Sequence, residues 1–320
     1  MSRIAVTGAG GFIGGAVCRR LAADGAEVVG IDAAAEAEQR IGAAGALPVV
    51  ADVTEPEAMR AALEGAESLV HTAAIVSDSG SMADHVRVNV GGTATVLDAA
   101  ASASVGRALH VSSVVVYGYD DPSHQDESAH LRNCGVPYID TKSAADRLAR
   151  RRGAVVVRPG DVYGPGSVPW SLRPLKMAQA GQLAVPGRGD GQMLPVYIDD
   201  LVDAILVALE RGRPGEAYAA WKDDERTTFE DFFNRFAEMS GARPARRLPR
   251  RAIRAVGLAK EAQARLLGTP PAMTRHSVVL VDRRGTVSAA KLRALGWEPK
   301  LALDEGLRLT EEWLRAEGLL

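Results

Sequence analysis

The sequence predicts an α/β fold, a doubly wound parallel sheet with a smaller C-terminal substrate-binding lobe. Two observations predict it. Short apolar runs alternate with helical patterns through residues 1–165, which is typical of parallel strands joined by crossover helices. The first of these units also contains a glycine-rich turn between its strand and its helix, which is the arrangement of a Rossmann-like sheet.

The glycine-rich turn follows a predicted strand over residues 3–6 and leads into a helix that continues to Asp24. Glycines three residues apart allow a tight turn, close approach of a phosphate, and packing of the helix on the strand. The pyrophosphate of a dinucleotide would then rest on the N–H groups of the first helical turn. The cofactor-binding residues expected here are Gly8, Gly11, Phe12, Ile13 and Gly14.

An acidic residue closes the next predicted strand, residues 27–31. Asp32 stands about twenty residues beyond the glycines, where a carboxylate holds a ribose 2′-hydroxyl and repels a 2′-phosphate. The sequence therefore predicts NAD as the cofactor, with NADP as the alternative.

The following segments continue the alternation. Strands are expected at 47–50, 68–74 and 107–113, and helices at 55–63 and 84–103. Ligands in such sheets bind beyond the carboxyl ends of the strands. This rule places four residues near the cofactor, namely Asp52, His71, Ala73 and Ala74: the carboxylate can accept from the adenine amino group, and the small alanine pair lets the dinucleotide lie on the backbone. Val53, next to Asp52, is also expected among the cofactor-binding residues.

Polar residues with catalytic potential lie at the end of the fifth predicted strand and in the helix that comes after it. Ser112 and Ser113 end it, and a helix expected at 138–152 begins with Tyr138 and Lys142. Positions i and i+4 share a helix face, so the phenol and the ammonium are neighbours. A nearby positive charge lowers the pKa of a tyrosine, and the phenolate is then a general base near neutral pH.

The remainder of the chain is expected to form the substrate lobe. After a sixth strand at 154–158, a Pro/Gly-rich segment indicates a boundary. We expect a dinucleotide-binding domain at 1–165 with a returning segment at about 196–220, and a lobe formed mainly by 166–320. Its predicted elements are helices at 172–180, 195–209, 229–240 and 304–317, a capping box at Thr227 and Glu230, and a short strand at 277–281.

Bulk properties exclude several classes of protein. A formal charge of −2 over 320 residues gives no overall attraction to nucleic acid or anionic membranes. There is no apolar run of about eighteen residues, the chain begins directly with a strand, and its two cysteines show no metal-ligand spacing. We expect a cytoplasmic protein without a membrane span. A basic segment, 243–265, is interpreted as a solvated helix face, with an anion or membrane-surface site as the alternative.

The motifs together resemble those of a known family across nearly the whole length. They are Thr7-Gly8-x-x-Gly11-x-x-Gly14, Asp32, Asp52-Val53, His71-x-Ala73-Ala74, Asn89, Ser112-Ser113 with Tyr117-Gly118, Tyr138-x-x-x-Lys142, Arg158-Pro159-Gly160-Asp161-Val162-Tyr163-Gly164-Pro165, and Tyr197-Ile198-Asp199-Asp200. The chain resembles the extended short-chain dehydrogenases/reductases, also grouped as NAD-dependent epimerases/dehydratases.

The resemblance implies a role for each catalytic position. Tyr138 is the acid/base, Lys142 lowers its pKa and holds the nicotinamide ribose, Ser113 hydrogen-bonds the reacting oxygen, and Asn89 supports the site through water or backbone. The segment after the sixth strand, with Pro159 and Val162, would pack on the nicotinamide. It also implies a seven-stranded sheet and a homodimer formed through the helices at 84–103 and 138–152.

Departures from the family pattern narrow the substrate. Nucleotide-sugar members typically have an Asn and an Arg where this chain has Asp161 and Met193. Losing the arginine and gaining a negative charge are both expected to oppose a diphosphate. Sugar dehydratases have an acidic pair where Val114 and Val115 follow Ser113 here. Residues 270–274 and 291–299 are more similar to the 3β-hydroxysteroid dehydrogenase and dihydroflavonol-reductase branch.

The sequence therefore predicts an NAD-dependent oxidoreductase that transfers a hydride between the nicotinamide and a secondary alcohol or ketone on a mostly uncharged, hydrophobic substrate. One alternative is a nucleotide-sugar epimerase with tightly bound NAD, in which the basic segment 243–265 supplies phosphate contacts. The other is a non-catalytic dinucleotide-sensing module, against which the Ser113, Tyr138 and Lys142 set argues.

Overall fold

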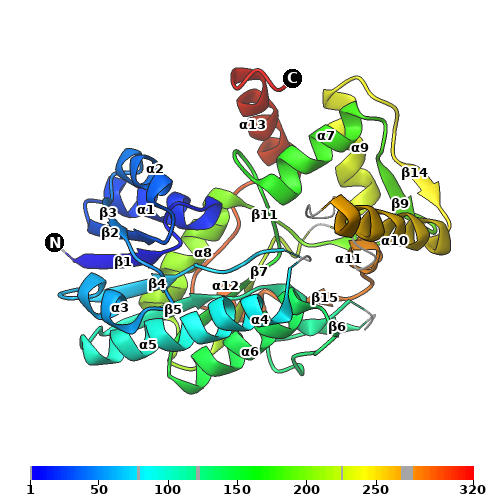
Figure 1. Cartoon of the computed structure of the whole chain (residues 1–320). Helices are drawn as coiled ribbons and strands as arrows, with labels where there is room; N and C mark the ends of the chain where they lie inside the picture. The colour runs from blue at the N-terminus through cyan, green and yellow to red at the C-terminus, as the bar shows by residue number, and fades with distance from the viewer. Residues whose placement is uncertain (1, 78–79, 120–122, 225, 268–276) are drawn as a thin grey trace.

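Seven parallel strands form the central sheet of the computed structural model, which describes residues 2–77, 80–119, 123–224, 226–267 and 277–320 (Figure 1). Their order is β12-β7-β5-β4-β1-β2-β3. This confirms the predicted doubly wound sheet, and the order reverses between β1 and β4, where open α/β sheets bind ligands. The strands are β1 (Arg3–Thr7), β2 (Glu27–Asp32), β3 (Leu47–Val50), β4 (Ser68–His71), β5 (Arg107–Val111), β7 (Val155–Pro159) and β12 (Ala217–Ala220).

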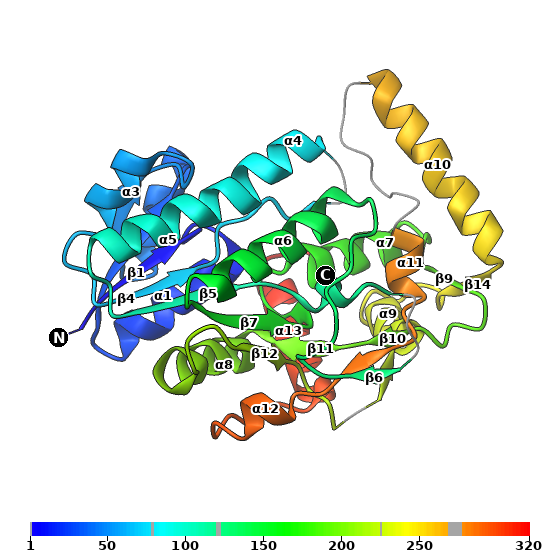
Figure 2. The same cartoon turned by 90° about the horizontal axis from the view of Figure 1, so that it is seen from below.

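Helices cover both faces of this sheet (Figures 1 and 2). One face carries α1 (Phe12–Ala23), α2 (Glu38–Ala43) and α8 (Ile198–Arg211), and the other carries α3 (Pro56–Ala62), α5 (Thr93–Ser102) and α6 (Pro137–Arg151). Alternate residues of β7 serve the two faces: Val155 and Val157 belong to the α1/α8 core, and Val156 belongs to the opposite core. Burial on both faces explains why these strands are continuous apolar runs.

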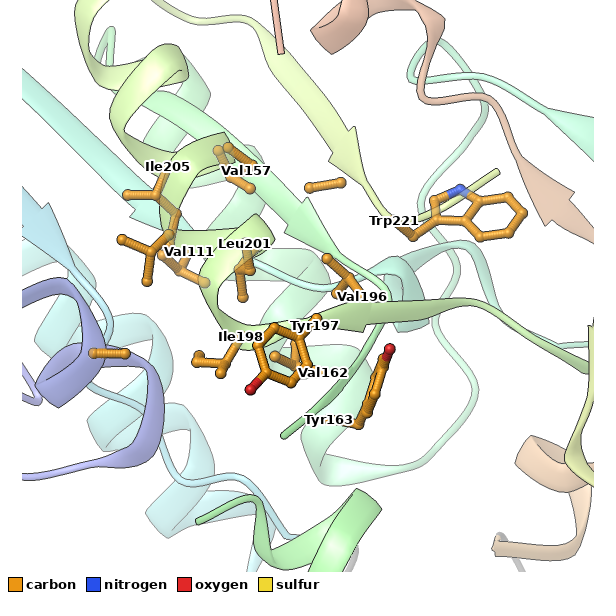
Figure 3. Close-up of a cluster of buried hydrophobic side chains, with 14 of the residues drawn as sticks. Val111, Val157, Val162, Tyr163, Val196, Tyr197, Ile198, Leu201, Ile205 and Trp221 are labelled. Carbon is orange, nitrogen blue, oxygen red and sulfur yellow. The ribbon is translucent and has the colours of Figure 1, made fainter. Parts of the chain in front are cut away.

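The core between the sheet and α8 is shown in Figure 3. Leu201 and Ile205 of α8 lie beside Val111 of β5 and Val157 of β7, and three of these four side chains are fully buried, while Val111 retains 4% exposure. Burying one such side chain stabilises the fold by roughly 1.5–3 kcal/mol. This packing fixes the carboxyl ends of β5 and β7, which precede the predicted catalytic segments.

The C-terminal part lies beside the carboxyl edge of the sheet and is smaller (Figure 1). Its core is an aromatic cluster on α9 in which Phe229, Phe232 and Phe236 pack with Trp170 and Tyr163. Its elements, with the short segments that connect the two parts, are β6 (His124–Gln125), β8 (Asp161–Tyr163), η4 (Val168–Leu172), α7 (Arg173–Gln179), β9 (Ala184–Pro186), β10 (Gln192–Met193), β11 (Pro195–Tyr197), β13 (Thr227–Thr228), α9 (Phe229–Met239), β14 (Arg246–Leu248), α10 (Arg250–Leu267), α11 (Ser277–Val281), β15 (Thr286–Val287), α12 (Ala290–Arg293) and α13 (Leu303–Ala316). The short turn η1 (Ala35–Ala37) belongs to the sheet part, between β2 and α2.

Three local predictions need correction. Residues 277–281 form the helix α11 and not a strand, because a short apolar run does not distinguish the two by periodicity. The capping box lies at Thr228 and Asp231, since Thr227 is paired with Met193 in a two-stranded sheet. The helix expected at 84–103 is divided into α4 (Met82–His85), the π-helical segment η2 (Val86–Gly92) and α5.

The basic segment 243–265 is divided between β14 and α10. Among the described side chains of this segment, Arg247 pairs with Glu230 at 2.8 Å and Arg250 pairs with Asp282. Both arginines are exposed, and the solvated-face interpretation of the segment stays a prediction. Within the described ranges no helix has the length and apolarity that crossing a membrane requires. Residues 270–274, which carry part of the branch resemblance, lie outside the described residues.

A buried ion pair holds α6 against β7. The Arg158 guanidinium donates two hydrogen bonds of 2.8 Å to the Asp146 carboxylate, and both side chains are fully buried. The third nitrogen of Arg158 donates to the Tyr117 hydroxyl at 2.6 Å and to the Glu127 carbonyl at 3.2 Å. The Glu127 carboxylate in turn accepts from the backbone N–H of Ala219. One guanidinium therefore connects α6 with the segments that follow β5.

Two histidines lie side by side on β4 and β5 beneath the helical layer. His71 and His110 are buried, with ring centroids 5.2 Å apart. Desolvation lowers the pKa of His71 to about 3 and lowers the pKa of His110 well below its usual value, and the nearby Lys142 charge adds to both effects. Both ring nitrogens of His110 lack a partner among the described residues. Both rings are therefore neutral in the folded protein at physiological pH.

Replacing Asp146 with Ala should lower the free energy of unfolding by about 3–5 kcal/mol, because it leaves a buried guanidinium without its counter-charge. Urea denaturation followed by circular dichroism measures this loss. Asp24→Ala, which removes an exposed partner of Arg20, is the matched control and should change stability little. A loss below about 1 kcal/mol for Asp146→Ala would contradict the role of the pair.

Acid should destabilise the protein as the pH falls below about 6.5, because unfolded histidines then take up protons that folded His71 and His110 do not. Each contributes up to about 1.4 kcal/mol per pH unit. Urea titrations between pH 7.5 and 5 should show a shallower pH dependence for His110→Phe than for the wild type. His130→Phe, at an exposed position, is the control. An unchanged slope in His110→Phe would show that His110 is protonated in the folded state.

Candidate active site

The glycine-rich turn joins β1 to α1 at the point where the strand order reverses. Gly8 has a φ of +70°, and a Cβ at Gly14 would lie 2.1 Å from the Gly8 carbonyl oxygen, so neither position accepts a side chain. Helix α1 begins at Phe12, and its N-cap residue Gly11 provides no side-chain hydrogen bond to the first turn. The N–H groups of Phe12 and Ile13 and the positive end of the helix dipole therefore suit the pyrophosphate of a dinucleotide.

The Asp32 carboxylate lies against this turn. It accepts hydrogen bonds from the backbone N–H of Gly10 at 3.0 Å and of Ala34 at 3.1 Å. A Cβ at Gly10 would lie 2.4 Å from the Cβ of Ala37 and 3.0 Å from the Asp32 carboxylate. The sequence argument missed Gly10 because it falls outside the three-residue glycine spacing. This geometry fits an adenosine ribose, since the fixed carboxylate offers acceptors at the end of β2.

The other predicted cofactor residues follow β3 and β4. One oxygen of Asp52 accepts from the N–H and the hydroxyl of Thr54, both at 2.9 Å, so the side chain also stabilises its own turn. Val53 is buried against Gly92. Ala73 packs directly on the glycine turn, where its backbone would lie 2.8 Å from a Cβ at Gly8, and Ala74 follows it, half-buried. These residues therefore meet at the carboxyl edge of the sheet.

A chain of buried hydrogen bonds leads from this edge toward α6. The Thr93 hydroxyl donates to the Asn89 carbonyl at 2.6 Å, so it accepts from the His71 Nε2, 3.0 Å away. The His71 Nδ1 must then accept from the Thr7 hydroxyl at 2.6 Å. The geometry therefore assigns the Nε2–H tautomer to His71. The sequence analysis named Thr7 only as part of the glycine motif and did not name Thr93, because the partner of each, His71, is distant in the chain.

Asn89 fixes the segment after β4 to α6. Its amide oxygen accepts from the N–H of Ile75 at 2.7 Å, and its amide nitrogen donates to the Ile75 carbonyl at 3.2 Å and to the Thr141 hydroxyl at 3.0 Å. The side chain is 1% exposed, so all of these bonds lie in the interior. Asn89 therefore joins the backbone after β4 to Thr141, which lies between Tyr138 and Lys142 on the helix.

Lys142 is a buried cation at the end of β5. Its Nζ donates to the Val111 carbonyl at 2.6 Å, and the side chain is 3% exposed. Burial lowers the pKa of Lys142 to about 8, against the opposing effect of the Asp146 charge. At neutral pH the ammonium is still mainly protonated, and it places a positive charge at the carboxyl edge of the sheet.

The serine pair and the tyrosine flank this edge. Ser113 is buried at the start of the turn η3 (Val114–Tyr117), and its hydroxyl accepts from the N–H of Val115 at 3.3 Å. Tyr138, at the start of α6, is half-buried and packs on an apolar cluster that contains Val115 and Ile139. The cluster brings the segment that holds Ser113 next to the first turn of α6. The neighbouring Ser112 hydroxyl is buried without a partner among the described residues.

In the segment after β7, the prediction for Asp161 needs correction. Pro159 ends β7 and Val162 is buried in β8, which pairs with β11. Asp161, expected to repel a diphosphate, instead forms a buried ion pair with Arg283, a residue that the sequence argument missed. Met193 is 1% exposed. The carboxylate is therefore balanced by a cation 122 residues away in the chain, and simple repulsion no longer follows from its charge.

Comparison with known proteins agrees with this geometry. The model of the NAD dependent epimerase/dehydratase family matches residues 4–220. The 2-alkyl-3-oxoalkanoate reductase of Shewanella oneidensis is 28% identical to this chain, over 96% of this chain and 85% of the relative. A ketoreductase of Stigmatella aurantiaca that acts on 4-hydroxy-2-methyl-3-oxo-4-farnesyl-3,4-dihydroquinoline-1-oxide is also 28% identical, over 95% and 94% of the two chains.

Solved structures show the same fold. The UDP-glucose 4-epimerase of Thermotoga maritima with UDP-glucose has a TM-score of 0.78 and 25% identity, covering 98% of this chain and 99% of that one. A double mutant of the dTDP-glucose 4,6-dehydratase DesIV of Streptomyces venezuelae, solved with NAD bound, has a TM-score of 0.78 and 25% identity, covering 98% and 97%. With its glycine turn, its buried lysine and the match over residues 4–220, this chain belongs to the NAD-dependent epimerase/dehydratase family.

Proposed function

We propose that this chain is an NAD-dependent oxidoreductase that interconverts a secondary alcohol and a ketone on a mostly uncharged, hydrophobic substrate. The observation that carries the proposal is Lys142, a buried ammonium one helical turn from Tyr138 and bonded to the end of β5, directly before Ser112 and Ser113. The relatives named as a 2-alkyl-3-oxoalkanoate reductase and a ketoreductase support a carbonyl as the reacting group. Because an oxoalkanoate is itself a carboxylate, the neutral substrate proposed for this chain rests instead on its own Met193 and on its Asp161–Arg283 pair.

The cofactor is held by the carboxyl edge of the sheet in this proposal. The first turn of α1 binds the pyrophosphate, Asp32 holds the adenosine ribose, and Lys142 holds the nicotinamide ribose, with Pro159 and Val162 beside the ring. When bound, the nicotinamide supplies or accepts the hydride. The Asp32 carboxylate repels a 2′-phosphate, so NAD is preferred to NADP.

Proton transfer belongs to the chain's own residues. During reduction the Tyr138 hydroxyl gives its proton to the carbonyl oxygen, and during oxidation the phenolate takes the alcohol proton. The Ser113 hydroxyl donates a hydrogen bond to the same oxygen. The Lys142 charge stabilises the phenolate, and the neutral rings of His71 and His110 add no competing charge. Above about pH 8 Lys142 loses its proton, so this stabilisation is lost.

A nucleotide-sugar epimerase with tightly bound NAD is the second candidate. Similarity to the epimerase structure that contains UDP-glucose favours it. Two observations disfavour it. Met193 is buried and uncharged, and the charge of Arg283 is balanced by Asp161, so neither position offers a free cation to a diphosphate. Turnover of a nucleotide sugar without net change in NADH would favour the epimerase.

The family resemblance supports two further proposals. The substrate lobe is nearest the 3β-hydroxysteroid dehydrogenase and dihydroflavonol-reductase branch, and the chain forms a homodimer through the α4–α5 segment and α6. Sedimentation velocity tests the dimer, since a monomer at micromolar concentration would exclude it.

Tyr138→Phe should lower kcat by about 10²–10⁴-fold, because it removes the only hydroxyl that the proposal uses for proton transfer. Lys142→Met should also lower kcat. It should raise the pH at which oxidation becomes fast, because the Tyr138 phenolate loses the positive charge that stabilises it. Hydroxysteroids, aliphatic and aryl alcohols, their ketones and nucleotide sugars form the panel, followed by NADH absorbance and product analysis. Lys176→Met, at an exposed lysine, is the control. Turnover by Tyr138→Phe at the wild-type rate would refute the proposed chemistry. If the variant has no turnover but still performs the protein's biological role, the chain is a dinucleotide sensor and not an enzyme.

Asp32→Asn should reduce the preference for NAD over NADP at least about tenfold, since it removes the charge that repels a 2′-phosphate. The ratio of kcat/KM for the two cofactors measures this preference. Asp24→Ala, outside the turn, serves as the control. A wild type that prefers NADP, or an unchanged ratio in Asp32→Asn, would show that Asp32 does not select the cofactor.

A further inference from the structure

Asp161 and Arg283 form a buried ion pair between β8 and the segment that precedes β15. The Asp161 carboxylate accepts from an Arg283 guanidinium nitrogen and, with the same oxygen, from the N–H of Leu194 at 2.8 Å. Arg283 also donates from Nε to the Gln192 carbonyl at 3.0 Å. Its guanidinium lies over the Phe229 ring, 5.5 Å from the centroid. Both side chains are 5% exposed, so water screens their charges little.

The pair lies at the edge where this fold binds its ligands. Asp161 comes two residues after the end of β7, and open α/β sheets bind ligands beyond the carboxyl ends of their strands. A small cavity of about 10 Å³, close to the space for one water molecule, is lined by Arg283, by Leu194 and by Val114. Val114 directly follows Ser113. The ion pair therefore adjoins the segment that holds the proposed substrate contact.

The hydrogen-bonding capacity of Arg283 is not used up. Its Nη1 is buried and has no partner among the described residues. The side-chain amide oxygen of Gln125, a residue on the wall of the same cavity, is likewise buried without a partner in that part of the chain. A guanidinium with an unused N–H is a strong anion ligand when its charge is available. Here Asp161 already balances that charge.

We infer that Asp161 determines substrate specificity by holding the charge of Arg283, so that this wall of the site presents a neutral ion pair and selects an uncharged ketone over a carboxylate or phosphate. The inference rests on the proposed function for the ketone, and it deepens that function by excluding anionic substrates. It also assigns Arg283 as the residue through which Asp161 acts.

Direct repulsion and charge balance by Arg283 make different predictions for Asp161→Asn. The asparagine keeps an oxygen that accepts from Leu194 but loses the charge. If Asp161 acted only by repulsion, anion binding would increase whether or not Arg283 were present. If Asp161 acts through Arg283, the increase requires the guanidinium and disappears in Asp161→Asn/Arg283→Met.

Inorganic phosphate is the first probe, and thermal unfolding of the full chain is the readout, with NaCl at equal ionic strength as the control. Phosphate should raise the Tm of Asp161→Asn in a saturable way, with an apparent affinity at least about tenfold above that of the wild type, because the variant has a buried cation without a partner. The wild type and the double variant should respond to phosphate as they do to NaCl. Equal phosphate responses in the wild type and Asp161→Asn, or a response retained in the double variant, would overturn the inference.

Kinetics with a 3-oxo acid and its methyl ester provide the second test. The wild type should prefer the neutral ester, and Asp161→Asn should shift the ratio of kcat/KM toward the acid at least about tenfold. If Asp161→Asn does not fold, the wild type still decides, since preference for the acid would contradict the inference. Absence of turnover with both compounds would count against the proposed function, whereas the phosphate experiment tests the ion pair without any turnover.

Discussion

The bidentate pair between Arg158 and Asp146 is the constraint on which the candidate site depends. Asp146 stands one helical turn after Lys142 and two turns after Tyr138, so its attachment to β7 sets how α6 presents both side chains to the sheet edge. Arg158 also bonds Tyr117, at the end of the turn that begins after Ser113. Two segments that supply the proposed catalytic groups are thus held by one guanidinium.

The cost of burying these charges is offset by their arrangement. An isolated charge in a protein interior loses several kcal/mol of hydration, and Asp146 reduces this loss for Arg158 and also opposes the fall in the pKa of Lys142. The histidines under Lys142 stay uncharged, so no further cation competes in the same volume. A second network, through Thr7, His71, Thr93 and Asn89, connects the glycine turn to α6 with neutral groups. Buried hydrogen bonds therefore join the cofactor edge to the proposed catalytic helix.

Local sequence patterns predicted much of this arrangement. The rest could not be predicted, because it depends on contacts between residues that are far apart in the chain. The strand, turn, helix and terminal acid of the first unit lie within 32 residues, and their period and spacing were sufficient to predict the sheet and the glycine turn. Arg158 was noted only as part of a motif, since its partner Asp146 becomes a neighbour only after α6 packs on β7. Arg283 was missed for the same reason, because 122 residues separate it from Asp161. The helix α11 shows the converse limit, where five apolar-rich residues fit a strand or a helix equally well.

A crystal structure of the chain with NAD and a bound ketone would test the central claim most directly. The account predicts that the Tyr138 hydroxyl and the Ser113 hydroxyl both lie within about 3.2 Å of the ketone oxygen, with Lys142 still bonded to the Val111 carbonyl. A phenol directed away from the ketone oxygen, or a site too narrow to hold any molecule beside the nicotinamide, would contradict it.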